Sequence, residues 1–234
     1  LMHIAAFCDS LEIFIFLQKK GLPIDSPSKD SYYPIHYASL NGSSKVVEYI
    51  LSVDPTQATI LPPVDFHLIL LATVSKKPNI LQLLFKNGAD PKAPENKNNQ
   101  PAMAAIRIRN IECLKVLLEN GVKNEIDRMG YSLLMMAVAC NEPEAVHLLV
   151  EYGEDLEYIN EKTYETALTL ACFQGFRSIV QYFCDRMNKV DIDPCVRKKA
   201  IVHYICDSKD PEIVKIVLSK GINVNRLDEN GHTG

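Results

Sequence analysis

The segment Tyr33-Pro34-Ile35-His36-Tyr37-Ala38 decides the fold, because its pattern returns along the whole chain. With Ala38 as the reference position, equivalent residues follow one another at intervals of 32 to 34 residues. They are Ala5, Ala38, Ala72, Ala105, Ala137, Ala171 and Ile205. Self-similarity with a period of this size is typical of proteins built from stacked repeats. Seven phased copies account for the 234 residues.

An apolar stripe supports this phase independently. Eight, nine, twelve and thirteen residues after each reference position the chain is apolar in every copy, except at Gln18. That spacing places the four side chains on one side of a helix, so each copy is predicted to contain a second, amphipathic helix. A residue that stops a helix follows in six copies, a glycine in five of them and Pro55 in the second. The glycines are Gly21, Gly88, Gly121, Gly153 and Gly221.

A first helix is predicted around each reference position. Pro34, Pro101 and Ser132 stand where the first turn of such a helix tolerates proline or a small polar residue. One copy is then a turn, a helix, a tight turn, a second helix and a polar loop. A single helix pair cannot bury both apolar faces, whereas stacked neighbours can. The predicted fold class is all-α, a solenoid of stacked helix-turn-helix units with short hairpin-like loops.

These residues resemble the ankyrin-repeat motif, which runs roughly D-x-x-G-x-T-P-L-H-x-A and then V-V-x-x-L-L-x-x-G-A-D. Three stretches carry the resemblance: residues 33–38, Asp127-Arg128-Met129-Gly130-Tyr131-Ser132-Leu133-Leu134, and Gly88-Ala89-Asp90. The tetratricopeptide family has a similar period but fits worse, because its Trp-containing signature is missing and the chain has no Trp. The resemblance covers essentially the whole chain.

The resemblance implies a single ankyrin-repeat domain over residues 1–234. Because both ends fall inside a repeat, and terminal repeats of a complete array carry a polar cap, we expect a fragment of a longer protein. The motif is broken at Pro62-Pro63-Val64-Asp65 and at Cys195-Val196-Arg197-Lys198, so irregular turns and the weakest layers are predicted there. The predicted repeats are approximately 1–27, 28–61, 62–94, 95–126, 127–160, 161–194 and 195–227, with the start of an eighth at 228–234.

Composition excludes several classes of protein. With 47% hydrophobic and 23% charged residues the chain can bury a core, and no apolar run approaches the roughly 20 residues of a membrane span. A net charge of -4 and the lack of a continuous basic stripe argue against binding to nucleic acid. Seven cysteines without a C-x-x-C pair favour a reducing compartment. We therefore predict a cytoplasmic protein, with the nucleus as the alternative location, and seven free thiols.

No group of residues has the spacing of a catalytic site. His3, His36 and His203 share one motif position, but that places them on different layers of a stack, and the ankyrin resemblance implies a structural hydrogen bond across the turn. Neither a nucleophile elbow, nor a phosphate-binding loop, nor a metal-ligand spacing is present in the sequence. The prediction is no enzyme activity, no catalytic, cofactor-binding or metal residues, and no cofactor.

The predicted function is a non-catalytic scaffold that binds a partner protein, of unknown identity, on its concave face and turn tips. The alternative is the targeting or substrate-recruiting module of a larger enzyme whose catalytic domain lies outside this fragment. Flanking sequence would separate the two. We expect a monomeric fragment that neither binds nucleic acid nor inserts into a membrane.

The resemblance also locates the binding surface. In ankyrin arrays the partner typically meets the turn tips and the first-helix positions two and three after the reference. Carried over residue by residue, the candidates are Tyr32, Phe66, Arg107, Ile108, Arg128, Met129, Tyr131 and Phe173. Aromatic residues and Arg are enriched at interface hot spots, and the last six are expected to form the densest patch. The alternative is that these side chains are half-covered by neighbouring repeats and serve packing alone.

Overall fold

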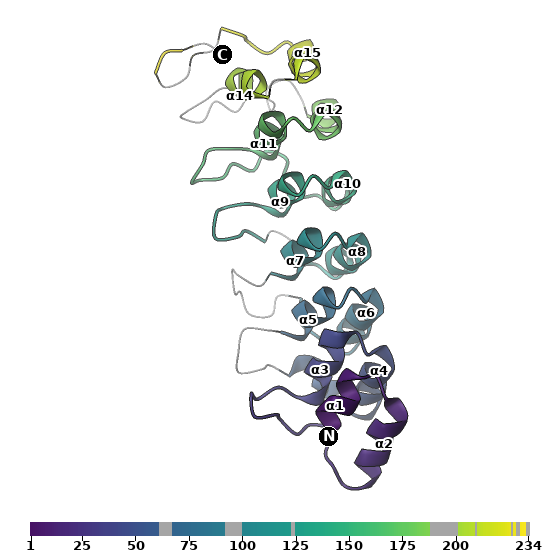
Figure 1. Ribbon diagram of the computed structural model, residues 1–234. Helices are drawn as coiled ribbons and strands as arrows, with labels where there is room; N and C mark the ends of the chain where they lie inside the picture. Colours follow the sequence, from purple (N-terminus) through teal and green to yellow (C-terminus); the bar gives the residue numbers. More distant parts are fainter. Residues whose placement is uncertain are drawn as a thin grey trace. The chain divides into compact units, whose positions relative to one another are not determined.

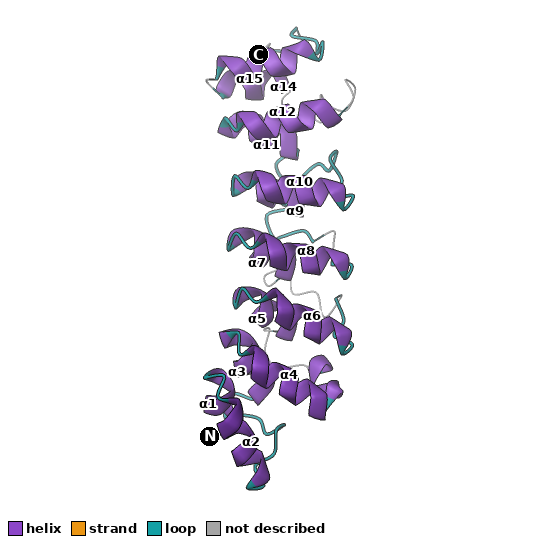
Figure 2. Ribbon diagram, turned by 90° about the vertical axis from the view of Figure 1, so that its right-hand side faces the viewer, coloured by secondary structure: helices purple, strands orange, loops and turns teal. Residues whose placement is uncertain are grey.

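The computed structural model describes residues 1–60, 67–91, 100–122, 125–187, 201–208, 210–225, 227 and 230–232. Across these residues the regular structure is helical (Figure 2), with one isolated antiparallel bridge between Ile126 and Ser132. The chain divides into two compact units, Leu1–Glu125 and Ile126–Gly234.

The first unit is built from helix pairs in two rows. In the first row α1 packs against α3, α3 against α5 and α5 against α7, while α2, α4, α6 and α8 form the second row (Figure 1). The all-α stack predicted from the sequence is confirmed here. The bounds are α1 Met2–Phe7, α2 Leu11–Lys19, α3 Pro34–Asn41, α4 Ser44–Val53, the 3-10 helix η1 Pro55–Thr59, α5 Leu68–Val74, α6 Pro78–Lys86, α7 Pro101–Arg107 and α8 Ile111–Glu119.

The second unit repeats this arrangement. The first helices α9, α11 and α14 pack in sequence, and α10 packs against α12 and α12 against α15. The bounds are α9 Leu133–Ala139, α10 Pro143–Glu151, α11 Ala167–Gln174, α12 Arg177–Arg186, α14 Ile201–Asp207 and α15 Pro211–Ser219.

The apolar stripe of the second helices forms the core. Nine residues after the reference position the side chain is completely buried in each of the first six copies. Burying one such side chain stabilises the fold by about 1.5–3 kcal/mol. The five predicted glycines follow the second helices with φ between 72° and 90°, and α4 ends at Val53, directly before Asp54-Pro55. The buried set is Phe14, Val47, Leu81, Leu114, Val146 and Val180.

The tight turn inside each helix pair has a feature that the sequence did not predict. The residue four positions after the reference adopts a left-handed conformation in all six copies where it is described. Only two of these residues are glycines, and a left-handed conformation costs other residues roughly 1–2 kcal/mol. The set is Asp9, Gly42, Lys76, Arg109, Asn141 and Gly175. The irregular turns predicted at residues 62–65 and 195–198 lie outside the described residues.

Candidate protein-interaction surface

A hairpin between Ile126 and Ser132 displays the first group of candidate residues; we call it the finger. Asp127 closes it, because its Oδ1 accepts the backbone N–H groups of Met129 at 2.8 Å and Tyr131 at 2.9 Å. The backbone N–H of Asp127 donates to the Tyr131 carbonyl at 3.0 Å. A side chain at Gly130 has no room, because a Cβ there would lie 2.4 Å from Asn160 Oδ1.

The loop that leads into the following repeat, residues 158–162, braces the finger through three consecutive carbonyl groups. The carbonyl of Gly130 accepts the Tyr158 hydroxyl at 3.0 Å, and that of Met129 accepts Asn160 Nδ2 at 3.0 Å. The carbonyl of Arg128 accepts Lys162 Nζ. A tip held in this way loses little conformational freedom when a partner binds, which lowers the entropic cost of association.

The side chains of the finger differ in their exposure to solvent. Arg128 is exposed and Met129 is 62% exposed, so both are available to a partner. Tyr131 is half-buried, and burial, followed by the negative charges of Glu165 and Asp127, raises the pKa of its phenol. The phenol therefore stays protonated at neutral pH and can donate a hydrogen bond.

The ends of the first helices carry the second group of candidates. Two residues after the reference position the side chain is exposed in every copy, and in five of seven it is apolar. Phe173, at 53% exposed, is the largest of these in the second unit. We call the set within each unit its helix-end column: Phe7, Leu40, Val74 and Arg107 in the first unit, and Ala139, Phe173 and Asp207 in the second.

The remaining candidates lie in the first unit. Arg107 is the exposed last residue of α7, and Ile108, which follows it, is half-buried. Tyr32 is also half-buried; with Asp30, Tyr37 and Leu40 it lines a cavity of about 360 Å³ that His36 and Leu71 complete. Phe66 lies outside the described residues. The structure thus places four candidates in the second unit, on the finger and at the end of α11, and three in the first.

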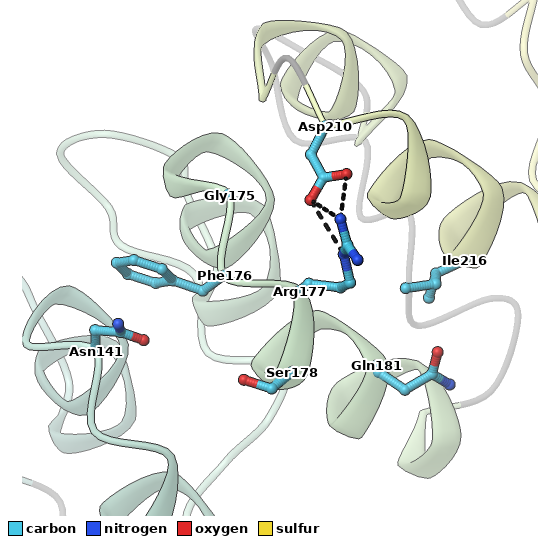
Figure 3. Close-up of a pocket in the computed structure, with 8 residues that line it drawn as sticks. All are labelled: Asn141, Gly175, Phe176, Arg177, Ser178, Gln181, Asp210 and Ile216. Atoms are coloured by element: carbon cyan, nitrogen blue, oxygen red, sulfur yellow. Dashed lines mark hydrogen bonds and ion pairs between the residues drawn. The ribbon is translucent and has the colours of Figure 1, made fainter.

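A larger open cavity, of about 660 Å³, lies at the tight turns of the second unit (Figure 3). Arg177 faces Asp210 across it, with Nη2 at 3.0 Å from each carboxylate oxygen and Nε at 3.2 Å from Oδ2. Asp210 also accepts the backbone N–H of Glu212 at 2.9 Å, which caps α15. The charged groups of this cavity therefore bind each other and join two repeats. The remaining lining residues are Asn141, Gly175, Phe176, Ser178, Gln181 and Ile216.

The histidines of the motif have structural partners. His3 Nε2 lies 3.1 Å from the Tyr32 carbonyl, and His203 Nε2 lies 3.0 Å from the His232 carbonyl. In each case the partner follows 29 residues later, on the next repeat. His36 Nδ1 accepts the backbone N–H of Tyr33 at 3.2 Å, and burial lowers the pKa of His36 to about 4.

The buried cysteines are not activated nucleophiles. Burial raises the pKa of both Cys113 and Cys184 to about 11, and that of Cys172 further, so all three stay protonated at neutral pH. None of the six cysteines in the described residues forms a disulfide, and Cys195 lies outside them. Over the same part of the chain no three His, Cys, Asp or Glu side chains gather as metal ligands. No helix there is long and apolar enough to cross a membrane.

Sequence reasoning missed two features of this surface. Tyr158 and Asn160 brace the finger, and their sequence signal is weak, since neither stands at the position of Asp127, which Glu161 occupies in the next repeat. The Arg177–Asp210 ion pair was also missed, although a separation of 33 residues, one period, places two side chains on adjacent repeats.

Comparison with known proteins agrees with this architecture. The sequence pattern of the family described as "Ankyrin repeats (3 copies)" matches residues 68–160 and 154–228, which is more than half of the chain. The crystal structure of the ankyrin repeat domain of Bcl-3 superposes with a TM-score of 0.74 at 21% identity, covering 88% of this chain and 93% of that one. That likeness shows the fold.

Two curated relatives match most of this chain in sequence. "Ankyrin repeat protein nuc-2" of Neurospora crassa is 24% identical over 177 residues, 74% of this chain and 16% of that protein. "Probable 26S proteasome regulatory subunit p28" of Saccharomyces cerevisiae is 26% identical over 171 residues, 69% of this chain and 74% of that protein. The chain therefore spans only a small part of the Neurospora relative. With the matched repeats, the paired helices and the finger all in agreement, the chain belongs to the ankyrin-repeat family.

Proposed function

We propose that this chain is a non-catalytic scaffold that binds a partner protein on the finger and the helix-end column. The braced finger carries the proposal: three side chains of residues 158–162 hold its backbone while Arg128 and Met129 remain exposed at its tip. Met129 is a long apolar side chain that is exposed on a rigid backbone. This arrangement is suited to docking, because little ordering is needed when the complex forms.

The composition of the column supports a protein as the partner. Apolar side chains that stay about half in contact with water in the free chain gain burial when a second protein covers them. Phe173 and Tyr131 are of types enriched at hot spots, and Arg107 and Arg128 add charge for specificity. The yeast relative is named as a regulatory subunit of the 26S proteasome, a large protein assembly, which accords with a binding role.

The experiment uses the chain as bait for proximity labelling or affinity capture, followed by measurement of the Kd for the partner that is identified. Met129→Ala, Tyr131→Ala and Phe173→Ala are each expected to weaken binding by about 2 kcal/mol, which is roughly thirtyfold, without a matching loss of stability. Phe16→Ala is the matched control, because Phe16 is 57% exposed but belongs to a second helix.

Two results would contradict the proposal. Equal loss of affinity in Phe16→Ala and Phe173→Ala would mean that the column has no special role. Undiminished binding in all three test variants, with folding intact, would place the partner elsewhere.

A further inference from the structure

The cavity of about 360 Å³ that Tyr32 lines belongs wholly to the first unit. It shares Leu40 with the helix-end column of that unit, and Leu40 is 42% exposed. Cavities of this size accept a small molecule or one large side chain, whereas a helix is too wide for them. We call it the aromatic cavity, and its lining residues are Asp30, Tyr32, His36, Tyr37, Leu40 and Leu71.

The aromatic rings of the cavity are held in position by hydrogen bonds and by edge-to-face packing. The Tyr37 hydroxyl donates to Ser28 Oγ at 3.3 Å, and the backbone N–H of Tyr32 donates to the same oxygen at 3.2 Å. The Tyr32 ring stands at 79° to the Tyr37 ring and at 73° to the His36 ring, with centroids 6.3 Å and 5.6 Å apart. A wall that is ordered in advance lowers the cost of binding a ligand.

One buried polar atom of the cavity wall has no hydrogen-bond partner among the residues that the structure describes. That atom is Nε2 of His36, a residue that is 1% exposed. Because Nδ1 accepts the backbone N–H of Tyr33, the ring proton is on Nε2, which can then only donate. In the two other copies with a histidine at this position, Nε2 lies 3.1 Å and 3.0 Å from a carbonyl oxygen. A buried donor without an acceptor is uncommon and points to an oxygen supplied by a ligand.

The charges around the cavity favour a neutral ligand. The His36 ring carries no charge at neutral pH, because burial lowers its pKa to about 4. Among the lining residues in the described part of the chain, Asp30 alone is charged, and it is exposed. A carboxylate or phosphate would meet this negative charge without a cation to offset it. The acceptor that suits His36 is therefore a neutral oxygen.

We propose that the aromatic cavity is an anchor pocket for a tyrosine side chain of the partner protein. The phenol oxygen of that tyrosine accepts the Nε2–H of His36, and its ring packs against Tyr32 and Leu40. This inference rests on the proposed function, because a partner that covers the helix-end column of the first unit also covers Leu40. It names the kind of residue that the partner inserts there.

Other side chains match the cavity less well. Phenylalanine has no acceptor, methionine only a weak one, and tryptophan only donates. Aspartate and glutamate bring the negative charge that Asp30 opposes. Asparagine and glutamine have a neutral oxygen, but they lack a ring to cover the apolar walls. A phenol combines the ring with a neutral oxygen.

Two small molecules test the pocket without a partner protein. The side chain of tyrosine is p-cresol and that of phenylalanine is toluene, so they differ only in the hydroxyl group. NMR titration of the chain with each probe measures the Kd. We expect p-cresol to bind at least about tenfold more tightly than toluene, because only p-cresol satisfies the buried donor. The amide signals of Leu40 and Leu71 should shift, and the Nε2–H proton of His36 should move downfield.

Two tryptophan variants locate the probe. Leu40→Trp should fill the cavity and weaken p-cresol binding at least about tenfold. Val74→Trp is the matched control, because Val74 is 46% exposed at the same position of the next repeat but is not among the described lining residues. His36→Phe should reduce the preference for p-cresol over toluene to less than about twofold. If His36→Phe does not fold, the two probes and the tryptophan pair still decide the result.

Several outcomes would overturn the inference. Equal affinities of the two probes for the unmodified chain would remove the hydrogen bond on which it depends. Equal p-cresol binding by Leu40→Trp and Val74→Trp would place the probe elsewhere. A His36 Nε2–H that already exchanges slowly with water in the free chain would show that the donor has a partner. Partner binding that survives Leu40→Trp would contradict the anchor role alone, whereas p-cresol binding without any captured partner would contradict the proposed function and leave the chemistry of the pocket standing.

Discussion

Phe173 and Phe183 belong to one repeat of the second unit, and their environments are opposite. Phe173, near the end of α11, is 53% exposed, whereas Phe183, in α12, is fully buried. The two positions recur in each copy, one on the helix-end column and one on the apolar stripe. The same residue type therefore has two roles, and its position within the repeat decides whether it packs in the core or is exposed to solvent.

The largest expected effect comes from replacing each of these two phenylalanines separately with alanine. Phe183→Ala removes a buried ring and leaves a cavity, so it should lower the free energy of unfolding by about 3–5 kcal/mol. Phe173→Ala should change it by less than about 0.5 kcal/mol, as is usual for exposed positions. Urea denaturation of both variants measures the difference. Equal losses would mean that the column is part of the core.

The next effect concerns His36, a buried polar side chain of the first unit. Burial, with a smaller contribution from the nearby His67, lowers the pKa of His36 from 6.5 to about 4. The unfolded chain therefore binds a proton between these pH values that the folded chain does not bind. The contribution of the neutral His36 to the free energy of unfolding is fully present above pH 6.5. It is lost as the pH falls towards 4, which lowers the free energy of unfolding by up to about 3 kcal/mol.

A comparison of wild type with His36→Gln isolates this contribution, because the carboxylates titrate equally in both proteins. Between pH 7.5 and pH 4.5 the wild type should lose about 2–3 kcal/mol more of its free energy of unfolding than the variant does. Parallel stability curves over this range would show that His36 titrates normally.

A smaller effect on stability and hydrogen exchange is expected from removing one brace of the finger. Asn160 is fully buried; its Nδ2 donates to the Met129 carbonyl, and its Oδ1 accepts the Lys162 N–H at 2.9 Å. Asn160→Ala should cost about 1–3 kcal/mol, because buried polar backbone groups lose their partners. It should also speed hydrogen exchange in residues 127–131.

Asp155→Ala is the control for this change. Asp155 also accepts a backbone N–H, from Glu157 at 2.9 Å, but it lies in an exposed turn. Its loss should leave exchange in the finger unaltered. If both variants behave alike, the finger is not braced by residues 158–162.

The smallest effect has the opposite sign. Lys76 is exposed and adopts a φ of 61° at a turn where Gly42 and Gly175 stand in other copies. Lys76→Gly should therefore stabilise the chain by about 0.5–1 kcal/mol. Lys115→Gly, within α8, should instead cost about 1 kcal/mol. Melting of the two variants in opposite directions is the expected result, and a loss in both would show that Lys76 is not strained.

The features that recur along the chain were predictable from the sequence. The positions of the second helices and their glycine ends follow from local rules that each copy repeats, as Leu114 and Gly121 illustrate in the fourth. The candidate residues of the finger, Arg128 and Met129, were also predictable as exposed, because the turn motif is recognisable around them.

What could not be predicted depends on neighbouring repeats. Ile13 and Ile179 are the same residue in the same pattern, yet their exposed fractions differ because burial depends on what lies against them. The bracing of the finger escapes sequence patterns for a related reason. Tyr158 and Asn160 bond to backbone carbonyls, and a carbonyl group carries no residue identity that a motif could record.

The brace also determines where the chain tolerates a change of length. Tyr158, Asn160 and Lys162 are alternate residues, and they reach three successive carbonyls one repeat earlier. A single inserted residue between Tyr158 and Lys162 would change the spacing of the three donors, and an insertion at the Arg128–Met129 bond would separate two of the carbonyls that they hold. Both segments therefore keep a fixed length, and a grafted peptide loop would have to be placed outside residues 127–131 and 158–162.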